Sequence, residues 1–562
     1  MDMEATRFDY VIVGAGSAGC VLAERLSADP ALRVLLVEAG PRDRNPWIHV
    51  PGGIFKLINN PAVDWCYLTE PEPGLNGRRM ALPSGRVLGG SSSINGMIYV
   101  RGQRSDYDGW RDLGNRGWSY DEVLPYFKRS EDQARGGDAF HGAGGPLGVS
   151  DPRFRFPIVD AFVAAAQEAG LPANPDFNGA RQEGVGLYQL TVRDGRRSSA
   201  ANAFLRPARR RPNLRVVTGA LVRRIVFEGT RAVGVEMVRG GAHEIARASA
   251  EVIVSAGAIG SPKLLQLSGV GDPQALRALG LPVVRALPGV GRNLQDHYQA
   301  RLVFKTRLPI TLNDRARFAW QRLLIGADYA VRRRGALTFG ASLAGAFART
   351  EPQLASPDVQ FHFQPLSVDS YDTGLHRFSA FTISVCQLRP ASRGSVSLRS
   401  ADPSDPASIV GNYLTEAEDG AAIVRGIRLL ERIVAQPALA SQVASRWKPA
   451  VDLVSDAEAL AYARDTGMTI FHPSGTCRMG SGDDAVVDDR LAVRGVDGLR
   501  VVDASIMPII VSGNTNAATI MIAEKAADLI LAARKRGDAP ADVGLGAEPS
   551  AAEPAPKSQV VA

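Results

Sequence analysis

The sequence predicts an α/β fold, α+β overall, divided into two or more domains or into one large interleaved pair. The chain has 562 residues, more than one domain usually holds, and 45% of them are apolar. A strand, a glycine-rich turn, a helix and a second strand follow one another between residues 8 and 38. Short valine-rich runs between residues 214 and 238 are typical of antiparallel strands.

The first element is a buried strand over residues 8–13 that ends at a glycine-rich turn. The turn reads Gly14, Ala15, Gly16, Ser17, Ala18 and Gly19. In such a turn the first glycine permits the sharp bend, the second admits a pyrophosphate, and the third lets the helix pack against the strand. The next apolar run ends at Glu38 and Ala39, with Glu38 placed 19 residues after Gly19. A carboxylate there accepts hydrogen bonds from both ribose hydroxyls, so the pattern predicts a dinucleotide site that disfavours NADP and leaves NAD and FAD open.

The later elements alternate between strands and helices. Residues 40–80 are rich in Pro, Gly and Asn and predict a long irregular excursion. Helical patterns cover residues 156–170, 262–268, 414–435 and 516–536, and buried strands are expected at 251–255 and 499–502. Residues 537–562 are rich in Ala, Pro and Gly and predict a disordered tail.

Composition excludes several classes of protein. The net charge of +7 is spread along the chain, and no arginine-rich arm or nucleic-acid motif is present. The four cysteines form no CxxC pair, so no disulfide framework or metal site is expected, and a cytoplasmic location is favoured. Neither a secretory signal nor a spanning helix is expected. The basic balance permits peripheral contact with the inner face of a membrane.

A second glycine cluster occupies residues 85–95. Gly89 and Gly90 remove side chains where another group must come close. Ser91 supplies a hydroxyl and an N–H that can cradle a phosphate or a ring edge, and Asn95 can both donate and accept. The residues alone leave a flexible structural loop as the alternative.

Six segments together resemble the glucose–methanol–choline (GMC) oxidoreductase family. They are residues 85–108, GAIGSPKLLQLSGVG (257–271), GVGRNLQDH (289–297), HPSGTCRMG (472–480), RVVDASIMP (500–508) and GNTNAATIMIAEKAA (513–527). The resemblance runs from about residue 8 to residue 532, and within the family it is greatest to choline dehydrogenases and bacterial flavin-dependent alcohol dehydrogenases.

The resemblance implies FAD and an interleaved architecture. A Rossmann-like FAD-binding domain would comprise residues 1–155, 214–300 and 466–536. A substrate domain on an antiparallel or mixed sheet covered by helices would comprise residues 156–213 and 301–465. Some relatives attach the flavin to a histidine just before the asparagine of the first signature. Ile94 stands there in this chain, so non-covalent FAD is expected.

Further cofactor-binding residues follow from the same resemblance. Val222 would touch the adenine through its backbone, and Asp503 and Ala504 would lie near the diphosphate or the ring. The remaining candidates are Trp65, Arg86, Gly96, Met97, Ala256, Phe471 and Thr515.

His472 and Asn516 are the predicted catalytic pair. His472 precedes Pro473, which biases it away from helical conformation, and matches the family's HPxGT segment. A histidine of near-neutral pKa suits removal of an alcohol's hydroxyl proton as hydride leaves the carbon. Asn516 matches a family position held by His or Asn and could orient the substrate oxygen, while Asn514 nearby could cap the helix instead. His297 is interpreted as structural.

The resulting prediction is oxidation of a primary alcohol to an aldehyde, with hydride passed to flavin N5 and electrons to a quinone or another acceptor. A choline dehydrogenase and an oxygen-using alcohol oxidase are the alternatives, followed by lyase or photodecarboxylase chemistry on the same fold. A non-catalytic flavoprotein is disfavoured because both the nucleotide and the catalytic segments are intact. The sequence leaves the particular alcohol, the acceptor and the oligomeric state open.

Overall fold

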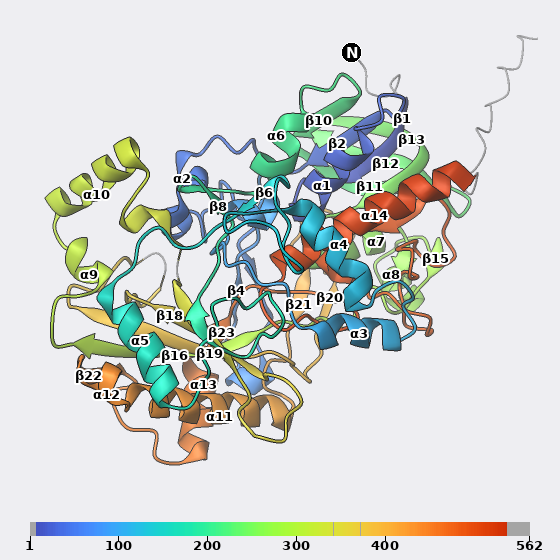
Figure 1. Cartoon of the computed structure of the whole chain (residues 1–562). Coiled ribbons are helices and arrows are strands. Elements are labelled where there is room, and N and C mark those ends of the chain that lie inside the picture. The colour runs from blue at the N-terminus through green and yellow to red at the C-terminus, as the bar shows by residue number, and fades with distance from the viewer. Residues whose placement is uncertain (1–6, 341, 371–372, 537–562) are drawn as a thin grey trace, which may run out of the picture.

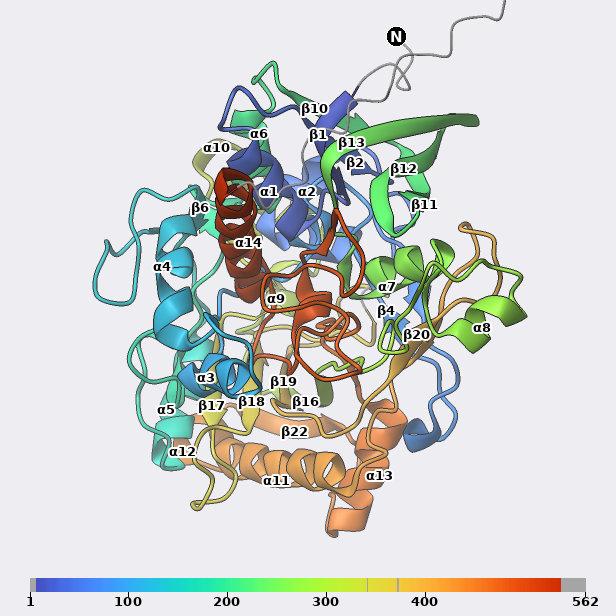
Figure 2. The same ribbon diagram turned by 90° about the vertical axis from the view of Figure 1, so that its right-hand side faces the viewer.

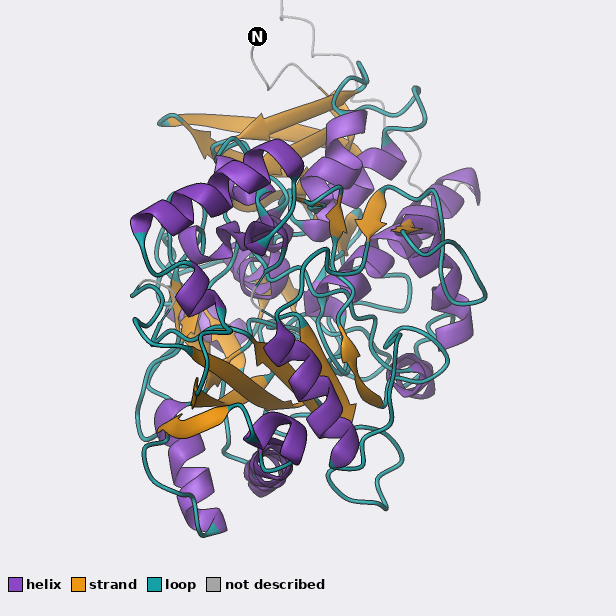
Figure 3. Ribbon diagram, turned by 60° about the vertical axis from the view of Figure 1, so that its left-hand side comes forward, coloured by secondary structure: helices purple, strands orange, loops and turns teal. Residues whose placement is uncertain are grey.

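A computed structural model describes residues 7–340, 342–370 and 373–536, and the predicted tail at 537–562 lies outside them. Two large sheets lie at opposite ends of the molecule, with helices and long loops between and around them (Figures 1 and 3). In the described part of the chain, no helix is long and apolar enough to cross a membrane.

The first sheet gathers strands from three distant parts of the chain. Its order is β10-β2-β1-β13-β12-β11, and β24 pairs with β13. The strands are β1 (Arg7–Val13), β2 (Val34–Glu38), β10 (Leu214–Thr218), β11 (Ala220–Glu228), β12 (Arg231–Arg239), β13 (Ala242–Val254) and β24 (Leu499–Val501). The prediction of antiparallel strands from residue 214 is right for β11 and β12 and wrong for β10, which runs parallel to β2. β10 is a short edge strand in which only Leu214 and Val217 are buried, and so short a valine-rich run carries no sign of strand direction.

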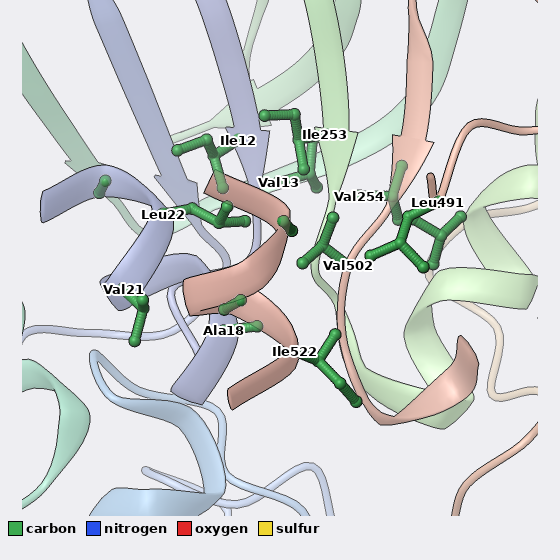
Figure 4. Packing of buried hydrophobic residues seen from close by; sticks show 14 of the residues in the cluster. Ile12, Val13, Ala18, Val21, Leu22, Ile253, Val254, Leu491, Val502 and Ile522 are labelled. Carbon is green, nitrogen blue, oxygen red and sulfur yellow. The ribbon is translucent and has the colours of Figure 1, made fainter. Parts of the chain in front are cut away.

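Two helices from opposite ends of the chain pack together beside this sheet. They are α1 (Ser17–Leu26) and α14 (Asn516–Arg536). Figure 4 shows Leu22 of α1 close to Ile12 of β1, and it shows Ile522 on the facing helix α14. All three side chains are at most 1% exposed. Full burial of each such side chain stabilises the fold by about 1.5–3 kcal/mol. This packing fixes the start of α14, and with it the residues just before that helix, against the glycine-rich turn.

The second sheet is antiparallel and has the order β22-β16-β19-β18-β17-β7, with β23 beside β16. Its strands are β7 (Gly184–Leu187), β16 (Tyr298–Thr306), β17 (Ala344–Ala348), β18 (Val359–Gln364), β19 (Ala380–Gln387), β22 (Val443–Lys448) and β23 (Met468–Thr469). Helices α5 (Pro157–Glu168), α11 (Ala417–Val434) and α13 (Asp456–Thr466) pack against it, and Figure 2 shows α11 and α13 below β16, β19 and β22.

Alternation along β18 separates the two faces of this sheet. Phe363 stacks on Phe162 of α5, so it points to the helix side. His362 and Gln364 lie on the opposite face and line a cavity. Because successive side chains of a strand point to opposite faces, this one strand supplies both core and site residues.

The other elements are short or lie at the edges. The helices are α2 (Pro46–His49), α3 (Arg104–Asp112), α4 (Tyr120–Ser130), α6 (Arg206–Ala208), α7 (Gly257–Leu267), α8 (Pro273–Ala278), α9 (Leu312–Arg315), α10 (Ala319–Arg332) and α12 (Pro437–Ala440). The short strands are β3 (Tyr67–Leu68), β4 (Ala81–Leu82), β5 (Glu131–Gln133), β6 (Leu147–Val149), β8 (Val192–Arg193), β9 (Arg196–Arg197), β14 (Val270–Gly271), β15 (Arg285–Ala286), β20 (Ser395–Ser397) and β21 (Ser408–Val410). Helix α7 begins five residues before the predicted 262–268.

Candidate active site

A cavity of about 940 Å³ extends from the carboxyl ends of the first sheet's parallel strands to one face of the second sheet. Ligands of open α/β sheets bind at this end of the strands. Most of the predicted site residues line the cavity: Gly14, Gly16, Ser17, Ala18, Glu38, Ala39, Trp65, Arg86, Gly90, Ser91, Asn95, Gly96, Met97, Val222, Ala256, Phe471, His472, Asp503, Ala504, Thr515 and Asn516. Ala15, Gly19 and Gly89 do not line it.

Those three residues instead hold the turns in shape. A Cβ on Gly19 would lie 1.9 Å from the Gly14 carbonyl oxygen, so only glycine lets α1 approach β1 so closely. Gly14 has φ +97°, and a Cβ there would meet the Ser255 carbonyl at 2.4 Å. The Gly89 N–H donates to the Ala15 carbonyl oxygen at 2.7 Å, which joins the second glycine cluster to the first. The two glycine-rich segments therefore form one wall, with the N–H groups at the start of α1 available to a phosphate.

Glu38 is buried beside this wall. Its two oxygens accept hydrogen bonds from the backbone N–H groups of Ala15 and Gly40, both at 2.8 Å. Burial raises the pKa of the Glu38 carboxyl to about 7. Each carboxylate oxygen has a second lone pair, so the group can still accept ribose hydroxyls while it holds the turn.

Arg86 supplies an independent sign that a polar ligand belongs here. Its guanidinium lies over the Trp65 ring at 4.9 Å, and its Nε is buried without a hydrogen-bond partner among the described residues. Buried polar atoms are rarely left unpaired in native proteins. An anionic, planar cofactor bound in the cavity fits this donor, the glycine wall and the acceptor at Glu38.

His472 stands at the far end of the cavity, held by a buried carboxylate. Asp296 accepts hydrogen bonds from the backbone N–H groups of His472 (2.8 Å) and His297 (2.9 Å) and from the hydroxyls of Tyr413 and Thr469. Burial raises the pKa of Asp296 to about 6. Phe471, just before His472, has φ +69°, a conformation that costs a non-glycine residue about 1–3 kcal/mol. The surrounding hydrogen bonds therefore impose the position of His472.

A chain of hydrogen bonds fixes which nitrogen of His472 carries the proton. His297 Nε2 lies 3.1 Å from the Leu388 carbonyl oxygen, which can only accept, so Nε2 carries the proton of His297. Its Nδ1 is then an acceptor, and it lies 3.0 Å from Nδ1 of His472. His472 must therefore be protonated on Nδ1, which leaves the Nε2 lone pair available.

The partner of that lone pair is Asn514. Asn514 Nδ2 lies 3.2 Å from His472 Nε2, and Asn514 Oδ1 accepts a hydrogen bond from Gln360 Nε2 at 3.3 Å. Gln360 also donates to the Tyr188 hydroxyl at 3.0 Å, and that hydroxyl donates to the Phe361 carbonyl. The amide of Asn514 is thus held with its NH₂ group toward the histidine.

Asn514, and not Asn516, contacts His472, while Asn516 also lines the cavity and its catalytic role stays a prediction. Asn516 is the first residue of α14, and its Oδ1 accepts a hydrogen bond from Ser17 Oγ at 2.7 Å. Asn514, considered above as a helix cap, lies two residues before the helix and contacts His472 instead. The physical reason is the start of α14: the extended residues before a helix reach further into the cavity than its first turn does.

Three buried histidines surround the cavity end, and all have lowered pKa values. Burial lowers the pKa of His297 to about 4 and that of His362 to about 3, the latter also through the nearby His297. Burial, with a smaller effect of His297 and His362, places the pKa of His472 well below its usual value. The site therefore holds His472 as a neutral imidazole. Sequence reasoning missed His362 and Gln360, although the alternating VQFHFQ segment was a signal that polar side chains share one strand face.

A cavity walled by two glycine-rich turns that ends at a neutral histidine is typical of a dinucleotide-dependent oxidoreductase. The chain belongs to the GMC oxidoreductase family, whose N- and C-terminal models match residues 8–299 and 390–523. It is 46% identical to the mitochondrial choline dehydrogenase of Homo sapiens, over 93% of this chain and 89% of that protein. It is 44% identical to an "alcohol dehydrogenase [acceptor]" of Pseudomonas putida, over 96% and 98% of the two chains.

Solved structures agree in fold. Pyridoxine 4-oxidase from Mesorbium loti superposes with a TM-score of 0.84 at 35% identity, covering 93% of this chain and 98% of that one. Formate oxidase from Aspergillus oryzae RIB40, in a variant studied for FAD modification, gives 0.89 at 28% identity, over 95% and 99% of the chains. The protein is an FAD-dependent oxidoreductase that acts on CH–OH donors, as predicted.

Proposed function

We propose that this protein oxidises a primary alcohol to an aldehyde, with His472 as the base that removes the hydroxyl proton. When bound, FAD supplies the acceptor, at flavin N5, for the hydride that leaves the alcohol carbon. The observation that carries the proposal is the hydrogen-bond chain from Leu388 through His297, which leaves Nε2 of His472 unprotonated and able to take a proton. Asn514 would hold the substrate oxygen beside that nitrogen and fix its orientation.

A neutral alcohol fits the cavity better than choline. Recognition of a quaternary ammonium group uses a carboxylate or an aromatic cage. The only carboxylates among the described lining residues are Glu38 and Asp503, which belong to the dinucleotide-binding wall. The lining side chains that adjoin His472 in the sequence are Ile470 and Phe471, which can enclose an uncharged substrate. Choline remains the second candidate because of the 46% identity to a choline dehydrogenase.

The electron acceptor is proposed to be a quinone or another small acceptor rather than oxygen. The name of the Pseudomonas putida relative, an alcohol dehydrogenase that uses an acceptor, supports this choice. A quinone dissolved in a bilayer would require peripheral contact with a membrane, and we place that contact on the cytoplasmic side. The cysteines of the described chain are free, which is compatible with a reducing compartment.

Anaerobic titration of the FAD-loaded protein tests the function. Aliphatic and aromatic alcohols should bleach the flavin absorbance near 450 nm, and admission of oxygen should restore it slowly if oxygen is a poor acceptor. Bleaching by choline alone would replace the alcohol assignment with the choline one. No bleaching by any of these donors would refute alcohol oxidation and favour lyase or photochemical activity.

The proposed cofactor contacts predict the effect of removing Glu38. Glu38→Ala should weaken FAD binding about 10- to 100-fold, because hydrogen bonds to a charged group are lost both from the ribose and from the turn at Ala15 and Gly40. Equilibrium dialysis against free FAD measures the change, with the exposed Glu228→Ala as the matched control. An unchanged affinity of Glu38→Ala for FAD would count against the ribose role of Glu38.

Acid precipitation should release all FAD from the native protein, because Ile94 offers no nucleophile for a covalent bond to the flavin.

The lowered pKa of His472 predicts an unusual pH dependence. The neutral imidazole is the active base, and protonation that abolishes it occurs only well below the ordinary histidine pKa of about 6.5. The anaerobic rate of flavin reduction by alcohol should therefore stay constant as the pH falls through 6.5 and decline only at distinctly lower pH. Stopped-flow measurements at saturating alcohol between pH 5 and 9 would show this. A decline centred at or above pH 6.5 would contradict the assignment.

A further inference from the structure

Helix α10 carries large apolar side chains on its outer face. Trp320, Leu323, Leu324 and Val331 are 60%, 74%, 59% and 82% exposed. An α-helix turns by about 100° per residue, so these four side chains fall within an arc of about 100°. Tyr329 lies opposite that arc and is the buried residue of the helix. The apolar stripe of α10 therefore faces away from the protein, which is the reverse of an ordinary surface helix.

The helix is held to the protein mainly through this opposite side. The Tyr329 hydroxyl donates a hydrogen bond to the Gly195 carbonyl oxygen at 3.0 Å. Figure 1 shows α10 at the outer edge of the molecule, away from the strands of both sheets. Four large exposed apolar side chains on one face of a single helix indicate an interaction surface.

Positive charge gathers at the two ends of α10, before Ala319 and from Arg332 onward. Six arginines and two aspartates occur between residues 312 and 334, and Arg317, Arg322, Arg332 and Arg334 are exposed. One of the aspartates, Asp328, faces Arg332 at 3.8 Å across solvent-accessible side chains, a pair that contributes little. A second copy of the chain would bring these arginines together against like charges, which disfavours self-association through this face.

We propose that α10 docks onto an anionic lipid bilayer, with Trp320, Leu323, Leu324 and Val331 inserted between the headgroups and the arginines bound to lipid phosphates. An apolar face that carries tryptophan and leucine, with arginines at both ends of the helix, is typical of a helix that lies in the membrane interface. Each arginine near an anionic surface adds about 1 kcal/mol of attraction.

The position of α10 gives this contact a consequence for the site. The chain leaves α10 through the short helix η6 (Ala336–Thr338) and reaches Ser342, which lines the cavity. Docking would place this side of the cavity next to the bilayer, where a dissolved quinone or a hydrophobic alcohol is concentrated. Delivery of such a molecule rests on the proposed function, whereas binding of the bilayer does not.

Co-sedimentation of the FAD-loaded full chain with vesicles tests the proposal. Vesicles of phosphatidylcholine with 30% phosphatidylglycerol should bind the protein, and pure phosphatidylcholine should bind it much more weakly. The combined substitution Trp320→Ser, Leu323→Ser and Leu324→Ser should reduce binding to the anionic vesicles about tenfold or more. Arg317→Gln with Arg332→Gln and Arg334→Gln should reduce it similarly and remove most of its salt dependence.

The matched control replaces two equally exposed apolar residues elsewhere. Val451 and Val454 are 71% and 83% exposed, and Val451→Ser with Val454→Ser should bind vesicles like the native protein. Wild-type binding by the α10 variants would overturn the proposal, as would equal binding to neutral and anionic vesicles. Sedimentation velocity should give the same mass for native protein and variants, and a dimer lost in the α10 variant would assign the surface to a second copy.

Activity separates the two proposals. With a soluble alcohol and a soluble acceptor, all of these variants should reduce flavin at the native rate, because none of the substituted residues lines the cavity. Vesicle binding without alcohol oxidation would refute the proposed function and leave the docking surface intact. Alcohol oxidation without vesicle binding would refute the docking surface and leave the proposed function intact.

Discussion

Replacement of His472 by alanine is expected to slow reduction of the bound flavin by an alcohol about 10²- to 10⁴-fold, the usual contribution of a general base. The substitution removes the Nε2 atom that the hydrogen-bond chain through His297 and Leu388 keeps unprotonated. FAD binding should be unchanged, because the glycine wall and Glu38 lie at the other end of the cavity. Anaerobic stopped-flow spectroscopy of the FAD-loaded variant measures the rate directly.

Two controls keep this result interpretable. His243→Ala changes an exposed histidine far along β13 and should reduce flavin at the native rate. Addition of imidazole should restore part of the rate to His472→Ala, because the substitution leaves space for a free base beside the substrate. A variant that keeps both its FAD and the native rate would show that another group removes the proton.

The hydrogen-bond network around His472 includes two residues that do not line the cavity, His297 and Gln360. His297 sets the tautomer of His472, and Gln360 sets the amide orientation of Asn514. Each atom in this hydrogen-bond network has a fixed role as donor or acceptor. A reversed tautomer of His297, or a flipped amide of Gln360, would therefore reverse the direction of the next hydrogen bond. We therefore propose that His297 and Gln360 position the site, a role compatible with the interpretation of His297 as structural.

The sequence was informative where a local pattern carried the chemistry. Gly14, Gly19 and Glu38 could be predicted because the turn, the helix contact and the end of the second strand all lie within about 30 residues. Helix α14 was predicted with its bounds, since its apolar residues and its basic last turn are continuous in sequence.

The remaining features depend on contacts between distant segments. β10 pairs in parallel with β2, and β23, at 468–469, joins the second sheet although the interleaved scheme assigned these residues to the FAD-binding domain. The domain boundaries as a whole stay a prediction. The choice between Asn514 and Asn516 likewise depends on where α14 starts relative to His472, 42 residues earlier in the chain.

The contact between Asn514 and His472 predicts the second large effect on the rate of flavin reduction. Asn514→Ala should slow flavin reduction about 10²- to 10³-fold, the cost of removing one oriented donor to an oxygen on which charge develops. Asn516→Ala should change the rate only a few-fold, since it loses the hydrogen bond from Ser17 at the start of α14 and leaves His472 untouched. The two variants remove the same amide from positions two residues apart, so each is the matched control of the other.

The balance between kcat and KM sharpens this comparison. An amide that holds the substrate oxygen mainly in the transition state lowers kcat more than it raises KM. Asn514→Asp, which replaces the NH₂ donor with an acceptor, should therefore be no better than Asn514→Ala, whereas Asn514→His keeps a donor at the same place and should recover much of the rate. If Asn516→Ala proves the slower variant, the original assignment of Asn516 holds, and the contact between Asn514 and His472 is structural.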